Sequence, residues 1–428
     1  MSSRILLVLI LVLQSMVSFA QTLEQAVQTT LQTNPDVMAS RYNVDAASQL
    51  ARQAKAGYFP SVDLVLAGGR ESSNNTTTRA ISDDNLRLTR EERSLRVTQM
   101  LYDGFSTRSL VEQQSALTES AIARLSSTQE SIAVRAVQVY LEVMRRSAVV
   151  ELTQVNLAHH DNTLGKISER FENGVGTRID VVQTQGRRAQ SKGNVLLSER
   201  DARNGRAEFF RVVGENPADL LLPAQITGLP STLEEAIETA MRINPGLLAA
   251  KSDLDAAVAA QKQARSAYQP RFDLEVGATR NDNGDGSIGA NDDETAVIRM
   301  TYNLYRGGAD KARINESQAR EFAARETVRS VQRSVTEDVT LVWNELEDIL
   351  VRLEYLEAHV KSTQEVLTVY NEQLSLGKRT LLDLLDVQNE LLRANIAYLT
   401  GQYTATLARY RVLASTGRLL NAMGLSSE

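Results

Sequence analysis

Residues 271–279 read Arg-Phe-Asp-Leu-Glu-Val-Gly-Ala-Thr, and apolar and polar residues alternate along this whole stretch. The alternation puts Phe272, Leu274 and Val276 on one face of a β-strand and their polar neighbours on the other face. The run is close in length to the roughly 9 to 11 residues that a tilted strand needs to cross a bilayer. It therefore predicts a strand with lipid on one side and water on the other, although a half-exposed hairpin of a soluble protein has the same period.

Three further segments alternate in the same way. Four strands cannot close a membrane barrel, whose smallest examples have about eight strands, so several chains must share one barrel. The polar stretches 70–85 and 281–293 predict extracellular loops between the paired strands. The four predicted strands lie at about 61–70, 94–103, 271–280 and 295–305, and the apolar faces of the other three carry Val62, Leu64 and Leu66, then Leu95, Val97 and Leu101, then Ala296, Ile298, Met300 and Leu304.

The sequence contains an internal duplication, and each copy includes one pair of these strands. Thr22-Leu-Glu-Gln-Ala recurs as Thr232-Leu-Glu-Glu-Ala, and Asn34-Pro35 recurs as Asn244-Pro245, both at an offset of 210 residues. Beyond the strands the offset becomes 203, at which Leu101-Tyr-Asp-Gly matches Leu304-Tyr-Arg-Gly. We therefore divide the mature chain into a first repeat, 21–229, and a second repeat, 230–428.

Long helices are predicted around each pair of strands. In the first repeat the apolar residues follow a helical period over 35–58, 106–173 and 178–213, and in the second over 309–376 and 380–422. A helix of about 65 residues is about 100 Å long. The two shorter helices of a repeat together approach this length, so stacked end to end they would form its antiparallel packing partner. The predicted fold is mainly α with a β-barrel part. The near-heptad seam of the first long helix consists of Leu110, Leu117, Leu125, Ile132, Val139 and Val143.

The N-terminus has the pattern of a secretory signal peptide over residues 1–20. Arg4 precedes an apolar run, Ile5 to Leu13, and Ser18 and Ala20 supply the small residues that a signal peptidase requires. After Ala20 no segment approaches the roughly 20 apolar residues of a spanning helix. The chain has no cysteine, which excludes a disulfide framework and a lipid-modified N-terminal cysteine. A net charge of −6 without a basic cluster argues against nucleic-acid binding.

Each repeat carries a Gly-x-x-Thr-x-x-Asp motif between its long helix and the returning helix. The motif comprises Gly174, Thr177 and Asp180 in the first repeat, and Gly377, Thr380 and Asp383 in the second. A threonine followed three residues later by an acidic residue is typical of a capping box at a helix start, where the carboxylate also favours the positive helix end.

No motif predicts an enzyme, a metal or a cofactor. The chain contains no P-loop, nucleophile elbow or zinc motif, so we expect neither catalysis nor a cofactor. Asp282-Asn-Gly-Asp-Gly286 faintly resembles a calcium loop but lacks the bidentate acid and the full spacing, so an exposed turn is the better interpretation. His159 and His160 have no acidic residue at metal-ligand spacing, and we interpret both as solvated.

These features resemble the TolC family of outer-membrane factors over essentially the whole mature chain. The resemblance lies in the duplicated Asn-Pro helices, the Tyr-x-Pro before a strand at 58–60 and 268–270, the Leu-Tyr-x-Gly motifs, and the run Gly377-Lys-Arg-Thr-Leu-Leu-Asp-Leu-Leu-Asp386. It implies a homotrimer in the Gram-negative outer membrane, with twelve strands in one barrel and a helical tunnel in the periplasm. It also implies two partners, an inner-membrane ABC transporter or other pump and a periplasmic adaptor (membrane fusion protein) that docks at the tunnel tip.

The resemblance also assigns roles at the tunnel tip, the closed periplasmic aperture of the family. By position, Asp180 and Arg379 resemble members of the family's ionic latch, and Asp383 and Asp386 resemble its constricting acidic rings. Threefold symmetry would repeat each carboxylate around the axis and favour cations. Where the family can carry a tyrosine three residues before the glycine, this chain has Leu374.

The function implied is that of an exit duct for exported protein or small-molecule cargo. Type I protein secretion is favoured by the absence of a lipid-anchor cysteine and by two runs, Leu-Tyr-Arg-Gly-Gly and Gly-Lys-Arg-Thr-Leu-Leu-Asp-Leu-Leu-Asp, which look like those of family members that secrete large adhesins. The alternative is the outer-membrane component of a multidrug or small-molecule efflux pump. A soluble periplasmic coiled-coil adaptor would explain the helices but not four alternating strands.

Overall fold

A computed structural model describes residues 21–81, 85–376 and 378–425 of the chain, so the predicted signal peptide and Gly377 lie outside the described residues. The fold class is confirmed: most of the chain is helical, and one antiparallel sheet completes it. The described residues divide into two compact units, one built from segments within 21–41, 124–247 and 332–425, and the other from segments within 42–123 and 248–331. Each unit takes segments from both repeats, so the predicted repeats describe the order of the sequence rather than separate packing units.

The helices fall into matching sets in the two halves of the chain, with short 3-10 turns at Thr78–Ala80 and Ser266–Tyr268. Their bounds are α2 Leu23–Thr33, α3 Pro35–Ala56, α4 Ser106–Glu172, α5 Arg178–Val213, α6 Leu233–Ile243, α7 Pro245–Arg265, α8 Ala309–Ser375, α9 Leu381–Ser415 and α10 Leu419–Ala422.

The helix predicted to run from 380 to 422 is too long. It ends at Ser415 because Gly417 takes a left-handed backbone conformation, with φ of 76°. The N–H of Arg418 then donates to the carbonyl oxygen of Leu413 at 2.8 Å, a bond that closes the last turn of α9 before the short α10 begins.

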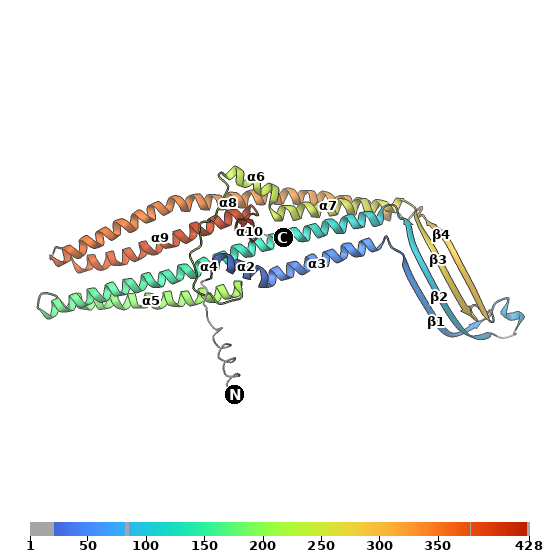
Figure 1. Ribbon diagram of the computed structural model, residues 1–428, viewed down its shortest axis with the longest axis horizontal. Coiled ribbons are helices and arrows are strands. Elements are labelled where there is room, and N and C mark those ends of the chain that lie inside the picture. The colour runs from blue at the N-terminus through green and yellow to red at the C-terminus, as the bar shows by residue number, and fades with distance from the viewer. Residues whose placement is uncertain (1–20, 82–84, 377, 426–428) are drawn as a thin grey trace, which may run out of the picture. The chain divides into compact units, whose positions relative to one another are not determined.

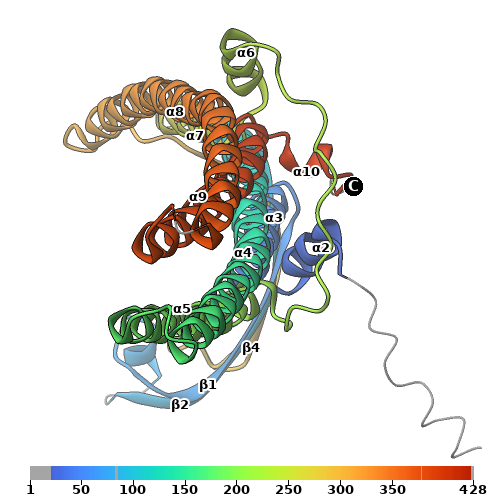
Figure 2. The same cartoon turned by 90° about the vertical axis from the view of Figure 1, so that its left-hand side faces the viewer.

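In the first unit, α4 and α5 form one antiparallel hairpin, and α8 and α9 form a second hairpin beside it (Figures 1 and 2). The first unit's largest apolar cluster lies where α2, α4, α5, α9 and α10 meet, around the fully buried side chains of Tyr140 and Phe209. Burial of aromatic side chains of this size is a main source of stability for the junction. The Tyr140 hydroxyl also donates to the carbonyl oxygen of Leu221 at 2.6 Å, which fastens the segment after α5.

The duplicated Asn-Pro motif joins two helices in each half. Asn34 accepts a hydrogen bond from the N–H of Asp36 at 3.0 Å, and its side-chain amide donates to the carbonyl oxygen of Val212 at 3.3 Å, near the end of α5. Asn244 has the same role in the second half, where its side-chain oxygen accepts from the N–H of Leu247 at 3.1 Å and its amide donates to the carbonyl oxygen of Ser415 at 2.9 Å. The following proline suits the first helical position, which needs no N–H donor. Each asparagine thus starts one helix and satisfies the end of another.

The second unit contains the sheet, whose four antiparallel strands run in the order β1-β2-β3-β4. Val62 faces Val97, Val97 faces Val276, and Val276 faces Ala296, so one apolar row crosses all four strands. This row lies on the predicted apolar face. The strands are β1 Ser61–Ser73, β2 Leu86–Tyr102, β3 Arg271–Asp282 and β4 Ala290–Thr301.

Three of the predicted strand bounds are wrong. β2 begins at Leu86 rather than near 94, and β4 covers Ala290–Thr301 rather than about 295–305. The prediction followed the apolar alternation, but the ladder continues through polar pairs such as Arg280 opposite Asp292. Backbone pairing does not require apolar side chains, so the strands extend past the apolar band into the predicted loops.

The two loops beyond the strands are bonded to each other. The side-chain amide of Asn75 donates to the carbonyl oxygen of Asp285 at 3.3 Å, and that of Asn283 donates to Thr89 at 3.1 Å. The carboxylate of Asp285 lies 3.4 Å from the guanidinium of Arg90. The stretch that faintly resembled a calcium loop therefore participates in a turn that is tied to the neighbouring strand.

A buried carboxylate holds the C-terminal segment against α4. Glu130 accepts hydrogen bonds from the N–H groups of Leu419 and Leu420, at 3.2 and 3.3 Å, and thus satisfies the start of α10. Its side chain is 8% exposed, and burial raises the pKa of Glu130 to about 7, against the two hydrogen bonds, which lower it.

This geometry predicts a pH-dependent stability. Because the pKa is raised in the folded chain, the contribution of Glu130 is fully present below its ordinary pKa near 4.5 and is lost as pH rises through about 7. We expect Glu130→Gln, which stays neutral, to remove up to about 3 kcal/mol of this pH dependence. Thermal unfolding followed by circular dichroism between pH 4.5 and 8 measures it, with Glu119→Gln on the same helix as the control. Parallel pH profiles for wild type and Glu130→Gln would contradict the prediction.

Candidate functional site

The predicted site residues lie at the two turns that join α4 to α5 and α8 to α9. In the first turn Gly174 takes a left-handed conformation, with φ of 75°, which a side chain would strain. The N–H groups of Val175 and Gly176 both donate to the carbonyl oxygen of Arg170 at 2.9 Å and so close the end of α4. In the second turn Gly377 lies outside the described residues, and the N–H of Lys378 donates to the carbonyl oxygen of Gln373 at 2.9 Å.

Both returning helices start with a capping box of the same geometry. The Thr177 hydroxyl accepts from the N–H of Asp180 at 3.2 Å, and the Asp180 carboxylate accepts from the N–H of Thr177 at 3.2 Å. Thr380 and Asp383 make the same two contacts, both at 3.3 Å. Each box satisfies two N–H groups that the helix leaves without partners and fixes the acidic side chain at the tip of the turn.

The carboxylate of Asp383 is held in its ionised form. The Thr380 hydroxyl donates to it at 2.8 Å, the N–H of Thr380 donates to the same oxygen, and the guanidinium of Arg379 lies 3.8 Å away. These contacts, the hydroxyl first, hold the pKa of Asp383 below its ordinary value. The side chain therefore carries its negative charge at neutral pH.

Arg379 makes its contacts within its own hairpin. Its guanidinium lies over the ring of Tyr370, 4.4 Å from the ring centre, and donates to the side-chain oxygen of Gln373 at 3.1 Å. Asp180 contacts Thr177, and within the described residues of one chain it forms no ion pair with Arg379. The predicted latch pair is therefore not brought together inside the chain.

Sequence reasoning missed Tyr370. The family can carry a tyrosine three residues before the glycine, where this chain has Leu374, but Tyr370 lies one helical turn earlier. Its position was detectable, because residues four apart share a helix face. The sequence does not predict the backbone path of the turn, which brings the guanidinium of Arg379 back over the ring of Tyr370.

Asp386 has a partner that the sequence did not suggest. The guanidinium of Arg187 on α5 lies 2.8 Å from the carboxylate of Asp386 on α9, so this ion pair joins the two hairpins of one chain. Two hydrogen bonds join the same hairpins nearby: the side-chain amide of Gln388 donates to the Thr163 hydroxyl at 3.1 Å, and Arg170 donates to the carbonyl oxygen of Leu374 at 3.4 Å.

The interpretation of both histidines as solvated is wrong for His160. His159 is exposed, but His160 is completely buried, and burial lowers the pKa of its imidazole. The error arose because the sequence shows only one helix at a time. Near His160 the helix α4 packs against α9, and the side chains of Thr163 and Gln388 are buried there as well.

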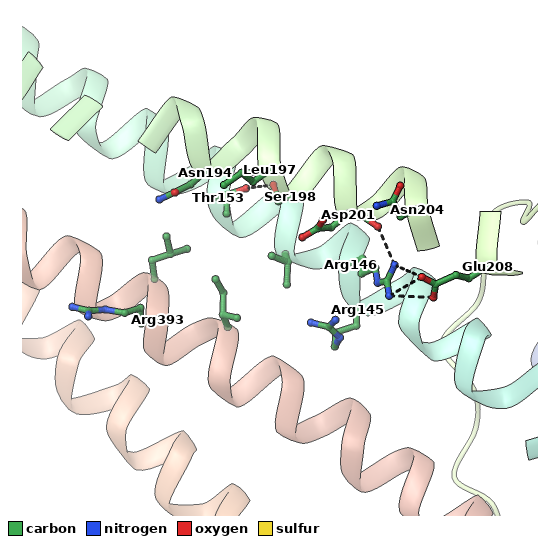
Figure 3. A pocket seen from close by; sticks show the side chains of 13 residues that line it. Arg145, Arg146, Thr153, Asn194, Leu197, Ser198, Asp201, Asn204, Glu208 and Arg393 are labelled. Atoms are coloured by element: carbon green, nitrogen blue, oxygen red, sulfur yellow. Dashed lines mark hydrogen bonds and ion pairs between the residues drawn. The ribbon is translucent and has the colours of Figure 1, made fainter. Parts of the chain in front are cut away.

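Two grooves follow the helices of the first unit. One, of about 690 Å³, lies near the turns and is lined by residues of α4, α8 and α9, including Lys166, Arg170 and Leu384. The other, of about 620 Å³, lies farther along α4, α5 and α9 (Figure 3). In it the guanidinium of Arg146 reaches the carboxylate of Glu208 at 3.2 Å and the carbonyl oxygen of Asp201 at 3.2 Å (Figure 3).

Residues 21–81, 85–376 and 378–425 contain neither a membrane-spanning helix nor a cluster of metal ligands. None of the described helices is both apolar enough and long enough to cross a bilayer. No group of three or more histidine, aspartate or glutamate residues in that part of the chain is placed to hold a metal ion.

The outer membrane efflux protein family matches the chain over residues 26–215 and 236–418, and so covers both hairpins and all four strands. The chain belongs to this family. The resemblance seen in the sequence is confirmed, and the chain is an outer-membrane efflux channel protein.

Several characterised relatives span nearly the whole chain. The outer membrane efflux protein BepC of Brucella suis is 26% identical over 95% of this chain and 88% of its own length. TolC of Escherichia coli is 24% identical over 95% and 84%, and the alkaline protease secretion protein AprF of Pseudomonas aeruginosa is 23% identical over 90% and 83%. The solved outer-membrane channel OprN has the same fold, with a TM-score of 0.81 and 20% identity over 92% of this chain and 90% of OprN.

The capping boxes predict a measurable loosening of the second turn. Thr380→Ala removes the hydroxyl that accepts from Asp383, which we expect to weaken the start of α9 by about 1 kcal/mol and to speed amide exchange there about fivefold. Hydrogen exchange of residues 381–384 in the purified channel measures it, and Thr380→Ser, which keeps the hydroxyl, is the control. Equal exchange rates in the serine and alanine variants would contradict a capping role.

Proposed function

We propose that this chain is the exit duct of a tripartite export system, that three copies form it, and that the two turns described above form its periplasmic gate. The observation that carries the proposal is the pair of equivalent turns, each of which fixes a carboxylate by a capping box at the end of a long hairpin. Charged residues cluster at these turns, where a small displacement of a hairpin would move them together.

The open sheet supports the assembly. β1 and β4 are its two edges, and they run antiparallel to each other because four strands alternate in direction. An edge with unpaired backbone groups is costly in lipid, and pairing of β4 with the β1 of the next copy removes every edge. Three copies would supply twelve strands. The apolar face is also open to lipid, since Val62, Leu64 and Ile298 are each more than 60% exposed in the single chain.

The proposed gate uses the four charged residues predicted from the sequence. Arg379 and Asp180 would form the latch between neighbouring hairpins when copies meet around the axis. Asp383 and Asp386 would form acidic rings, because cyclic symmetry repeats each carboxylate at the same height. Arg379 already lies 3.8 Å from Asp383, so a latch that draws it away would also change the charge at the ring.

We propose type I protein secretion as the specific role, with a periplasmic adaptor and an inner-membrane ABC transporter as partners. AprF, named for the secretion of an alkaline protease, resembles the chain along most of its length. The second candidate is small-molecule efflux with another pump, which the name of BepC favours at a similar identity.

Single-channel recording tests the gate. We expect the purified protein to conduct in small steps in a planar bilayer, and Arg379→Gln to enlarge the steps severalfold, because it removes the cation that holds the closed turn. Arg393→Gln on α9 is the matched control, since Arg393 lies away from the turns and donates to the carbonyl oxygen of Asn389 on its own helix. A protein that forms no channel would refute the duct, and equal steps in both variants would refute the latch.

Deletion of the gene in its own host separates the two cargo classes. If the duct serves type I secretion, we expect one or more large proteins to disappear from the culture medium, as measured by mass spectrometry, while susceptibility to drugs changes less than about twofold. The wild-type gene should restore export. An unchanged set of secreted proteins together with increased drug susceptibility would favour the efflux pump.

A further inference from the structure

The ion pair between Arg187 and Asp386 connects two hairpins that the sequence describes as repeats of each other. Arg187 lies on α5 in the first hairpin, seven residues after Asp180, and so shares a helix face with it. Asp386 lies on α9 in the second hairpin, three residues after Asp383. The guanidinium and the carboxylate approach to 2.8 Å at the end of the first unit that carries the two turns.

We propose that Arg187 is a closing and charge-setting residue of the gate. It holds the first hairpin to the second within one chain, and it neutralises Asp386, so that the uncompensated negative charge near the tip comes mainly from the other acidic residues. This inference rests on the proposed function, because it assigns a partner to one of the carboxylates of the acidic rings.

The pairing of Arg187 is selective. Its neighbour Arg188 pairs with Asp161 on α4, inside the first hairpin. Two adjacent arginines therefore divide their roles, one within a hairpin and the other between hairpins. The two positions also point to different neighbours because successive residues on a helix lie about 100° apart.

The duplication makes this ion pair specific to one kind of junction. At the offset of 203 residues, the counterpart of Arg187 is Glu390 and the counterpart of Asp386 is Gln183. A junction between the second hairpin of one copy and the first hairpin of the next would bring together those counterparts, which cannot form an ion pair. The charge contact thus marks the junction within a chain, and the junctions between chains have to rely on other residues.

The two hairpins also contact each other through groups that do not involve Arg187. Gln388 donates to Thr163, and an apolar cluster of Ile167, Leu381 and Leu385 packs against Val181. These contacts remain when Arg187 is replaced, so the variant should still fold and assemble. Arg187 is 34% exposed and Asp386 59% exposed, so salt should weaken their attraction while it leaves the apolar cluster intact.

Bilayer recordings of a double-mutant cycle test the proposal. The variants are Arg187→Gln, Asp386→Asn and the double variant, with Arg188→Gln as the matched control. We expect Arg187→Gln to raise the ratio of potassium to chloride permeability about twofold, because it uncovers Asp386, and to lengthen open events. Asp386→Asn should lower the ratio and lengthen open events to the same extent, and the double variant should lengthen them no more than either single variant does.

Two results would overturn the proposal. If the wild type conducts but the double variant lengthens open events by the product of the two single-variant factors, the two residues do not act as a pair. If Arg187→Gln changes the permeability ratio and the open time no more than Arg188→Gln does, Arg187 has no distinct role at the junction. Absence of any channel in the wild type would instead refute the proposed function, so the two failures are distinguishable.

Chemical crosslinking gives an independent measurement, because the natural chain has no cysteine. With the substitutions Arg187→Cys and Asp386→Cys, a short bis-methanethiosulfonate reagent, which forms a disulfide with each thiol and releases a sulfinate at each, should link the two positions within one chain. The link should hold the channel in its small-step state until a reductant cleaves the disulfides. A crosslink that joins two chains, or an intrachain link that leaves the steps unchanged after reduction, would contradict an intrachain closing role.

Discussion

Backbone N–H and carbonyl groups find no water inside a bilayer, and this constraint governs the rest of the structure. The chain meets lipid with four strands whose apolar row runs from Val62 to Ala296, yet β1 and β4 each leave one side unpaired. Pairing with further copies satisfies those groups, and the resulting symmetry arranges the hairpins around an axis. In the proposed assembly, the pairing that the sheet requires would therefore place the residues of the turns in rings rather than alone.

The helical part holds its long hairpins together by contacts that differ from one end to the other. Near α2 the junction is apolar and buried around Tyr140 and Phe209. Near the turns a smaller apolar cluster of Ile167, Leu381 and Leu385 is joined by a buried hydrogen bond from Gln388 to Thr163 and by the ion pair of Arg187 with Asp386. The ion pair is partly exposed and the apolar cluster is smaller than the one around Tyr140, so local opening costs least at the turns. The smaller apolar contact at the turns suits the proposed opening at that end.

The sequence predicted what repeats along the chain and what a short segment decides alone. The alternation of Phe272, Leu274 and Val276 gave the apolar face, and the Thr-x-x-Asp spacing gave the geometry found at Thr177 and Thr380. It failed where the outcome depends on a neighbour distant in sequence. Burial of His160 requires α9 beside α4, and the partner of Asp386 lies 199 residues away. The polar ends of the strands were not predicted, because backbone hydrogen bonds between strands do not depend on the hydrophobicity of the side chains.

Asp383 shows how local and symmetric effects oppose each other. Three carboxylates brought together around an axis raise one another's pKa, and a ring that became protonated would lose its attraction for cations. In each chain the Thr380 hydroxyl and N–H donate to Asp383, and Arg379 lies close by, so its pKa is lowered before any assembly takes place. The capping box that starts α9 therefore offsets the repulsion that symmetry would impose. A residue pattern that first indicates a helix start also keeps the proposed ring charged.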